Sequence, residues 1–179
     1  MRKATAAALT GLLFLTAGAP AFAADGDRTD IDDITILATT DTHGTALNYN
    51  YFTGKPFGSK EEPKSLRGMD HLATAITEIR KEKGEDAVAL LDNGDANQGS
   101  SLETVYKRDH AKGDVDPIAT IYNYLNYDAG VVGNHEFNYG LDELQDYKAD
   151  LEFPLLGANV TDKKTGKPYL EPYTFVNKK

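Results

Sequence analysis

The sequence predicts an α/β fold built on a mainly parallel sheet, because short apolar segments alternate with helical segments along its 179 residues. Three of the apolar segments lead directly into polar residues of the types that ligate metals or transfer protons. In open sheets of parallel strands, ligands bind at the carboxyl ends of the strands, so any site is expected there.

Four strands are expected. Residues 34–40 (ITILATT) are apolar and β-branched, with no polar alternation beyond the threonines, which is typical of a buried strand. Residues 87–91 (AVALL) predict a second buried strand, 131–132 (VV) mark the centre of a third, and 154–160 (PLLGANV) predict a fourth. Residues 161–176 are expected to form a hairpin or meander that turns at the sequence KTGK.

Three helices are expected between these strands. Within residues 66–83 the apolar side chains recur at spacings of three and four, and Gly84 ends the pattern. Pro117 opens a second helix, whose apolar residues share one face. Residues 141–150 form the third, where Asp142 near the start suits the helix dipole.

The composition excludes several classes of protein. There is no cysteine, so the chain has no disulfide framework, no thiolate zinc site and no cysteine nucleophile. The 28 acidic residues outweigh 19 basic ones, and the net charge of -9 argues against binding a nucleic-acid polymer. A hydrophobic fraction of 40% is that of an ordinary globular protein.

The N-terminus predicts an export signal. Residues 1–23 combine Arg2 and Lys3 with a short apolar stretch and end in Ala-Phe-Ala, the small-residue pattern of a cleavage site. The alternative is a membrane anchor, but spanning the hydrocarbon core takes about 20 apolar residues. We therefore expect an exported protein, in the periplasm, the cell wall or the medium, without stable membrane insertion of the mature chain. Residues 24–33 predict a flexible acidic leader.

The first strand leads into Asp41 and His43. Alternation along an extended segment points both side chains the same way, so both can reach one cation. A carboxylate with an imidazole suits zinc, manganese or iron better than calcium or magnesium. The pair by itself is a weak signal, and a turn carboxylate beside a surface histidine is an equally good interpretation.

The second strand leads into Asn93, Gly94 and Asp95. Gly94 lets the backbone turn tightly, and the two oxygens of the Asp95 carboxylate can bridge two cations. An ordinary Asn-Gly turn is the competing interpretation.

The third strand leads into Asn134, His135 and Glu136. Asn134 offers a neutral ligand oxygen, and His135 is a candidate general acid or base. Glu136 is either a ligand or a partner of one. The alternative is a helix entry with Asn134 as its N-cap.

The order of these blocks is more specific than any block alone. The blocks D-x-H, G-D and G-N-H-E follow three successive strands, and in this the sequence resembles the calcineurin-like metallophosphoesterases. Residues 92–95 (DNGD), 98–100 (QGS) and 133–140 (GNHEFNYG) look like those of exported bacterial 2',3'-cyclic-nucleotide 2'-phosphodiesterase/3'-nucleotidases, within the 5'-nucleotidase and UDP-sugar hydrolase family. The resemblance covers about residues 34–176.

The resemblance implies a fold and a set of roles. The fold would be the first half of a metallophosphoesterase four-layer αββα sandwich. Asp41 and His43 would bind a first divalent metal, Asp95 would bridge it to a second, and Asn134 would bind the second. The two metals would be of the zinc, manganese, cobalt or iron type. His135 would stabilise the substrate phosphate and protonate the leaving oxygen.

Four further residues are expected at the substrate or behind the ligands: Asn93, Glu136, Asn138 and Tyr51. The 5'-nucleotidases usually carry Asp at the position of Asn138, so this residue favours the cyclic-phosphodiesterase branch. Tyr51 and the aromatic residues beside it are expected to line the substrate entrance, with ordinary packing as the alternative. Packing or a surface position is expected for His71 and a solvated position for His110, since neither lies in a motif.

The family pattern continues with a lone histidine and G-H-x-H, yet no histidine follows His135. We therefore expect residues 34–179 to be the N-terminal portion of a truncated catalytic domain, whose C-terminal half is the missing partner. The complete protein is expected to hydrolyse nucleotides, as a cyclic-nucleotide phosphodiesterase/3'-nucleotidase or, alternatively, as a 5'-nucleotidase or UDP-sugar hydrolase. The chain alone is expected to be nearly inactive, and a non-catalytic module that binds metal or nucleotide is the remaining alternative.

Overall fold

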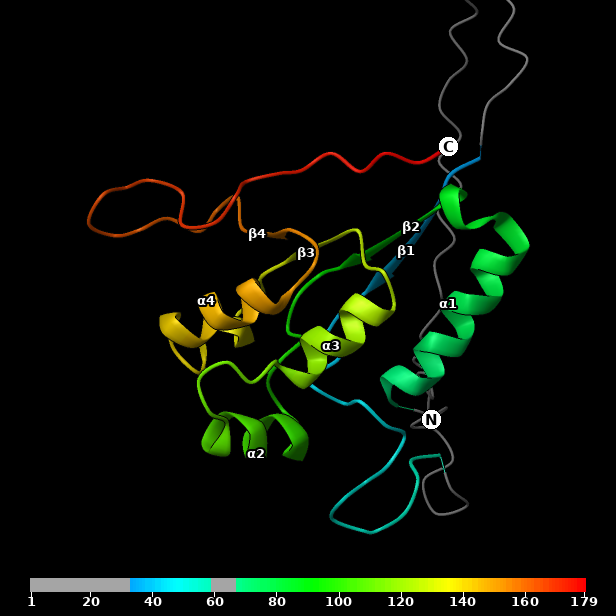
Figure 1. Cartoon of the computed structure of the whole chain (residues 1–179), viewed down its shortest axis with the longest axis horizontal. Helices are drawn as coiled ribbons and strands as arrows, with labels where there is room; N and C mark the ends of the chain where they lie inside the picture. The colour runs from blue at the N-terminus through cyan, green and yellow to red at the C-terminus, as the bar shows by residue number, and fades with distance from the viewer. Residues whose placement is uncertain (1–32, 59–66) are drawn as a thin grey trace, which may run out of the picture. The chain divides into compact units, whose positions relative to one another are not determined.

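Four parallel strands form one sheet in the computed structural model, which describes residues 33–58 and 67–179 (Figure 1). The order across the sheet is β1-β2-β3-β4, as along the chain. The strands are β1 (Thr35–Thr39), β2 (Val88–Asp92), β3 (Ala129–Val131) and β4 (Leu155–Leu156). The expected mainly parallel sheet is confirmed. The predicted signal peptide and all but the last residue of the predicted leader lie outside the described residues.

The register of the strands brings their carboxyl ends to one edge of the sheet. Along β1 and β2 the pairing runs from Thr35 with Val88 to Thr39 with Asp92. Asp92 also pairs with Gly130 of β3. The polar segments that follow β1, β2 and β3 therefore start side by side.

Four α-helices and two short 3-10 helices connect and follow the strands. They are α1 (Met69–Lys83), η1 (Glu85–Ala87), α2 (Ser101–Asp109), α3 (Pro117–Tyr124), η2 (His135–Phe137) and α4 (Leu141–Asp150). The sequence predicted three of the α-helices. It missed α2, although a cap is visible in Ser100 and Glu103, where the Ser100 hydroxyl accepts a hydrogen bond from the Glu103 N–H at 3.2 Å. Among the described residues, no helix has the length and apolar character needed to cross a bilayer.

The hydrophobic core lies between one face of the sheet and the helices α1, α3 and α4. It joins Leu90 of β2 to Met69 and Ile76 of α1, and Tyr122 of α3 stacks on Tyr127 at 4.3 Å between ring centroids. Because successive right-handed crossovers advance in one direction across the sheet, they place their helices on the same face. The described residues thus form one helical layer on one sheet layer.

The opposite face of the sheet is partly open, which corrects one expectation. Residues 34–40 were expected to be buried, yet the side chain of Ile36 is 66% exposed while Leu37 packs against the core. The strand alternates because none of the helices in the described residues covers its second face. A cavity of about 490 Å³ lies over this face, and Thr174 and Val176 of the C-terminal segment line it. That segment ends where the Lys179 N–H donates to the Asp86 carbonyl.

The region after β3 is less regular than the sequence predicted. The fourth strand was expected over residues 154–160 but has two residues, because the Val160 N–H closes a turn on the Gly157 carbonyl. The hairpin expected at residues 161–176 is reduced to one antiparallel bridge between Thr161 and Pro168. Beyond it the chain runs as an extended segment, coloured red in Figure 1.

A buried ionic cluster fixes α2 against α3 and α4. Lys107 Nζ lies 3.0 Å from an Asp116 oxygen and 3.2 Å from a Glu143 oxygen. Asp116 also caps α3 by accepting from the Ile118 and Ala119 N–H groups. His110 joins the cluster through Glu143, at 3.4 Å, so the solvated position expected for it is wrong.

Glu103 is the unusual member of this region, because it is fully buried and neither carboxylate oxygen has a hydrogen-bond partner among the described residues. Burial, assisted by the nearby Asp116 carboxylate, raises the pKa of Glu103 to about 8, although Lys107 acts in the opposite direction. A group whose pKa is raised by folding binds its proton more tightly in the folded state.

We predict that Glu103 makes the free energy of unfolding fall as the pH rises from its ordinary pKa of 4.5 to about 8. In this window the unfolded chain releases the proton while the folded chain retains it. Glu103→Gln removes the titration, so its melting temperature relative to wild type should rise steadily with pH up to about 8 and then level off. The matched control is Glu78→Gln, an exposed residue of α1. A difference that stays constant over the whole range would contradict the prediction.

Candidate metal centre

The loops after β1 and β2 are joined by backbone hydrogen bonds. The N–H groups of Asp41 and His43 donate to the carbonyls of Gly94 and Asp95, both at 3.0 Å. The Gly44 N–H donates in turn to the Ala96 carbonyl. The two loops therefore continue side by side beyond the sheet, and their side chains are held in a common frame.

Three residues of these loops have the left-handed backbone conformation that only glycine adopts freely. The φ angles are 54° at Asp41, 48° at His43 and 57° at Asp95. For side chains with a Cβ this conformation is uncommon and costs free energy unless the surroundings enforce it. All three are residues that the sequence marked as metal ligands, so the strain falls on the candidate site.

His43, Asp95 and His135 converge at the centre of this frame. One potential ligand atom from each lies within 4.8 Å of the other two. The imidazole rings of His43 and His135 meet edge to face, with 4.9 Å between centroids. His43 Nδ1 lies 2.7 Å from the Gln98 carbonyl, which can only accept, so Nδ1 carries the proton and Nε2 keeps its lone pair for a metal.

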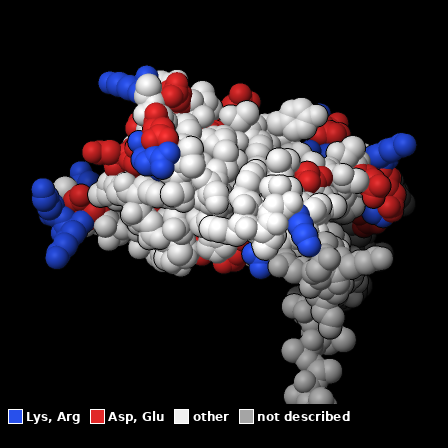
Figure 2. Space-filling model, turned by 90° about the horizontal axis from the view of Figure 1, so that it is seen from below, with Lys and Arg blue, Asp and Glu red and all other residues white. Residues whose placement is uncertain are grey.

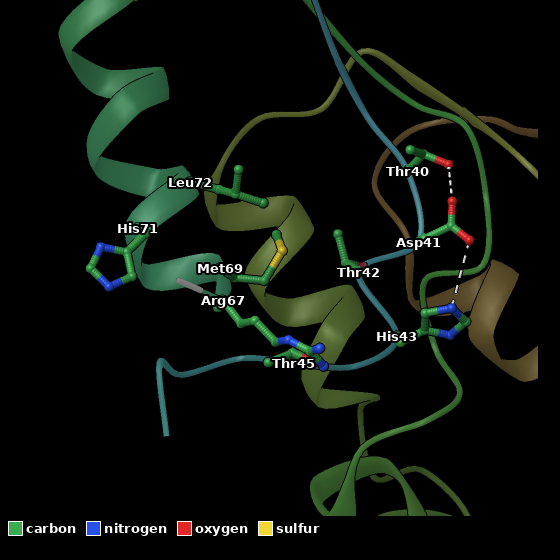
Figure 3. Close-up of a pocket in the computed structure, with 10 residues that line it drawn as sticks. Thr40, Asp41, Thr42, His43, Thr45, Arg67, Met69, His71 and Leu72 are labelled. Carbon is green, nitrogen blue, oxygen red and sulfur yellow. Dashed lines mark hydrogen bonds and ion pairs between the residues drawn. The ribbon is translucent and has the colours of Figure 1, made fainter. Parts of the chain in front are cut away.

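Asp41 stands at the edge of the same group. Its carboxylate lies 3.6 Å from His43 Nε2 and accepts a hydrogen bond from the Thr40 hydroxyl. Figure 3 shows the Asp41 and His43 side chains next to each other, with His71 turned away from them. Both side chains line a cavity of about 370 Å³. His71 is exposed, in line with the surface position allowed for it.

Asp95 depends on glycines on either side of it. A Cβ on Gly133 would lie 2.3 Å from an Asp95 carboxylate oxygen, and a Cβ on Gly94 would lie 2.3 Å from the Gly133 nitrogen. The β2 and β3 loops can approach this closely only because both positions lack a side chain. The His135 N–H then donates to the Asp95 carboxylate at 2.8 Å.

Glu136 acts on the backbone of the site. It is buried, and its carboxylate accepts hydrogen bonds from three N–H groups, those of Asp95 (2.9 Å), Ala96 (2.6 Å) and Gly133 (2.6 Å). Both carboxylate oxygens are therefore engaged. The sequence left open whether Glu136 is a metal ligand or a partner of one. Its hydrogen bonds to backbone N–H groups favour the role of a partner that holds the ligand Asp95 in place.

The remaining predicted residues have different surroundings. Asn138 Nδ2 lies 2.8 Å from His135 Nδ1. Asn134 is exposed and occupies the N-cap position of η2, as the competing interpretation expected, but its side chain accepts no capping hydrogen bond. Asn93 lines the cavity over the open sheet face, and Tyr51 lines another cavity beside Gly44. The structure thus places Asn93 and Tyr51 outside the group of His43, Asp95 and His135.

Asp92, the last residue of β2, was not among the predicted site residues. The side chain is buried and accepts hydrogen bonds from the Thr39 hydroxyl, the Tyr122 hydroxyl and the Gly94 N–H. Burial raises the pKa of Asp92 to about 6, against the effect of these hydrogen bonds. A carboxylate directly after the apolar run 87–91 was the signal that could have revealed it.

Comparison with known proteins agrees with this geometry. The model of the family described as "Calcineurin-like phosphoesterase" matches residues 34–176. The chain belongs to the calcineurin-like phosphoesterase family. The crystal structure of the calcineurin-like phosphoesterase YfkN from Bacillus subtilis superposes with a TM-score of 0.70 at 34% identity, over 79% of this chain and 41% of that one.

Curated relatives of this phosphoesterase chain are much longer. A 2',3'-cyclic-nucleotide 2'-phosphodiesterase/3'-nucleotidase of Yersinia enterocolitica is 38% identical over 146 residues, which are 81% of this chain and 21% of the relative. A 5'-nucleotidase of Vibrio parahaemolyticus is 32% identical over 180 aligned residues, 99% of this chain and 28% of the relative. The chain therefore spans about a fifth to a quarter of the length of these relatives.

Members of this family use divalent metals, and the residues present fit such a group. Imidazole and carboxylate donors together suit a first-row divalent ion. The hydrogen bond to Gln98 leaves the His43 Nε2 lone pair available, as a metal ligand requires.

The contact between Asn138 and His135 predicts a tautomer. An amide nitrogen only donates, so His135 Nδ1 accepts and the ring proton resides on Nε2. Asn138→Asp supplies an acceptor instead, and the proton should move to Nδ1. Long-range proton–nitrogen NMR of the metal-free chain with neutral His135 distinguishes the two forms. The control is Asn134→Asp, which adds the same charge at the residue before His135 and should leave the proton of His135 on Nε2. If the proton of His135 also stays on Nε2 in Asn138→Asp, the assignment is refuted.

Proposed function

We propose that this chain supplies the N-terminal part of an exported, metal-dependent phosphoesterase that hydrolyses nucleotides. The observation that carries the proposal is the convergence of His43, Asp95 and His135 within 4.8 Å at the carboxyl edge of a parallel sheet. Export rests on the signal-peptide pattern of residues 1–23.

Two divalent ions would be shared among four side chains. Asp41 and His43 would hold the first ion, Asp95 would bridge both, and Asn134 would hold the second. Bound metals of this kind supply an activated water and neutralise charge on the phosphoryl oxygens. The backbone strain at Asp41, His43 and Asp95 supports this assignment, because such strain clusters at functional residues.

His135 would donate a proton to the leaving oxygen. The Asn138 amide donates to Nδ1, so the proton of the ring is held on Nε2, the atom on the far side from Asn138. The Asp95 carboxylate accepts from the His135 N–H and so fixes the backbone from which the ring projects. General acid catalysis of this type contributes roughly 10²–10⁴-fold.

Two relatives named above suggest two nucleotide classes. One is named a 2',3'-cyclic-nucleotide 2'-phosphodiesterase/3'-nucleotidase and the other a 5'-nucleotidase. Asn138 favours the first, with a 5'-nucleotidase or UDP-sugar hydrolase as the alternative. Further metal ligands are required by the family pattern, and residues 136–179 of this chain contain no histidine. We propose that those ligands belong to protein outside these residues, so that this chain alone has weak metal affinity and little turnover.

A second candidate function follows from the same observation. A half-site that has Asp41, His43 and Asp95 but lacks the later histidines can bind a metal ion or a nucleotide without hydrolysing the nucleotide. Metal content and hydrolysis measured on one sample separate the candidates, since metal without turnover in the longer protein supports a binding module.

We predict different losses from two substitutions at the site. Asp95→Ala should lower the affinity of the chain for Zn²⁺ by more than about tenfold, because it removes the bridging ligand. In the longer protein, His135→Ala should lower kcat by roughly 10²-fold or more while the metal content stays near that of the wild type. His71→Ala, on the exposed side of α1, is the control for removing a histidine. If His135→Ala loses the metal, His135 is a ligand and its role as an acid is wrong.

A second prediction concerns the substrate. The longer protein should hydrolyse 2',3'-cyclic AMP with a higher kcat/KM than 5'-AMP, and chelation of divalent metals should abolish both reactions. Asn138→Asp should shift the ratio of the two kcat/KM values towards 5'-AMP. Faster turnover of 5'-AMP by the wild type would favour the 5'-nucleotidase alternative.

A further inference from the structure

Tyr122 of α3 has a buried hydroxyl group that contacts both the end of β2 and the loop after β1. The side chain is 1% exposed. Its oxygen lies 3.0 Å from an Asp92 carboxylate oxygen and 2.8 Å from the Thr42 hydroxyl. Thr42 stands between Asp41 and His43 in the chain, and Figure 3 shows the three residues in succession on the loop. Neither Tyr122 nor Thr42 has a role in the proposed hydrolysis.

The Asp92 carboxylate gives these hydrogen bonds their direction. With its pKa of about 6, Asp92 is ionised at neutral pH and only accepts, so Tyr122 donates its one hydroxyl proton to it. Tyr122 then offers only lone pairs to Thr42, and the Thr42 hydroxyl donates to Tyr122. On the other side, Thr39 donates to Asp92 at 2.7 Å, and the Tyr127 hydroxyl donates to Thr39 at 3.0 Å. Two chains of donors thus end on one buried charge, and hydrogen bonds in such chains strengthen one another.

A second route joins Asp92 to the same loop. The other oxygen of the Asp92 carboxylate accepts a hydrogen bond from the Gly94 N–H at 2.9 Å. The Gly94 carbonyl accepts in turn from the Asp41 N–H at 3.0 Å. The loop after β1 is therefore attached to Asp92 at two successive residues, through the backbone of Asp41 and the side chain of Thr42. Two attachment points fix the direction of the loop as well as its position.

The backbone of the loop requires such attachment. Asp41 and His43, on either side of Thr42, have left-handed φ angles of 54° and 48°. Residues with a Cβ keep this conformation only where the surroundings enforce it. Tyr122 is well placed to do so, because its ring is stacked on Tyr127 in the hydrophobic core. A displacement of Thr42 would turn the backbone of both neighbours.

Surface charge is a poor substitute for these interior contacts. Figure 2 shows the charged side chains of one face at the surface, mainly towards its edges. Water and salt weaken the interactions of exposed charges. Asp92 is 5% exposed, so its attraction for the hydroxyl groups around it is screened far less.

We propose that Tyr122 is a positioning residue of the metal centre, because its hydroxyl, held by Asp92, fixes Thr42 and so orients the ligands Asp41 and His43. The inference rests on the proposed function, which assigns those two side chains to the first divalent ion. It adds that the affinity for this ion depends on a hydroxyl group in the core that is not itself a ligand.

The test is Tyr122→Phe in the 179-residue chain, which removes the hydroxyl and keeps the ring. Asp92 retains Thr39 and Gly94 as donors, so the fold should persist, and circular dichroism verifies this. The affinity for Co²⁺ should fall about 3-fold or more, since groups that directly hold a ligand contribute about 10- to 100-fold. The d–d absorption of Co²⁺ at saturation should also change, which a loss of stability alone does not produce. The matched control is Tyr147→Phe, a comparably buried tyrosine that makes no hydrogen bond to either loop among the described residues.

Thr42→Val is a second variant, because it removes the partner hydroxyl with little change of shape. If both hydroxyls act through one contact, Tyr122→Phe combined with Thr42→Val should lower the Co²⁺ affinity no further than the larger single effect, to within about 2-fold. Thr42→Ser keeps the hydroxyl and should retain most of the affinity that Thr42→Val loses. Losses that multiply in the double variant overturn the coupling of Tyr122 to the ligands through Thr42.

Amide hydrogen exchange of the metal-free chain tests the same contact without a metal. In Tyr122→Phe the N–H groups of Asp41 and His43 should exchange about 3-fold or more faster than in Tyr147→Phe, while the Leu90 N–H of β2 is unchanged. If this difference is found but the wild type binds no Co²⁺, the metal centre is overturned and the positioning of the loop stands. If the wild type binds Co²⁺ and Tyr122→Phe binds it equally well, the positioning role is overturned and the metal centre stands.

Discussion

The candidate site depends on a single buried carboxylate. Glu136 accepts hydrogen bonds from N–H groups on both sides of the gap between the β2 and β3 loops, at Asp95, Ala96 and Gly133. Hydrogen bonds to a charged group contribute about 1.5–3 kcal/mol each, and an unpartnered buried N–H costs a comparable amount. The three bonds therefore hold the β2 loop against the β3 loop. A separate hydrogen bond, from the His135 N–H to the Asp95 carboxylate, joins the same two loops across 40 residues of sequence.

Hydrogen bonds between the loops also explain why the backbone strain of the site residues is tolerated. Asp41, His43 and Asp95 hold left-handed backbone angles that their side chains disfavour. Each of their loops is bound to its neighbour by backbone hydrogen bonds, and Gly94 and Gly133 allow the loops to approach closely. The cost of the strain is offset by bonds made elsewhere, which leaves side chains projecting in directions that relaxed backbone would not give them.

The charged residues around α2 and α3 have a different role from those at the carboxyl edge of the sheet. Around α2 and α3, Lys107 is buried between acidic groups, and burial raises the pKa of Glu103 more than the nearby Lys107 lowers it. At the carboxyl edge of the sheet, imidazole and carboxylate groups of His43, Asp95 and His135 lie within 4.8 Å of one another instead. Because the chain has a net charge of -9, the anionic substrate proposed for it would need cations supplied locally at the site.

The sequence by itself determined the parallel α/β order, three of the four described α-helices and the residue types of the site. Apolar runs such as 87–91 and the spacing within 66–83 are local signals, and the segments that follow the strands carried the Asp, His and Asn residues that the family pattern contains. The tertiary structure decided what these residues contact. It exposed one face of β1, reduced β4 to two residues, and turned Glu136 onto backbone N–H groups, none of which follows from periodicity. The physical reason is that an element forms from neighbours in the chain, whereas burial and hydrogen-bond partners are chosen between segments that meet only when the sheet is assembled.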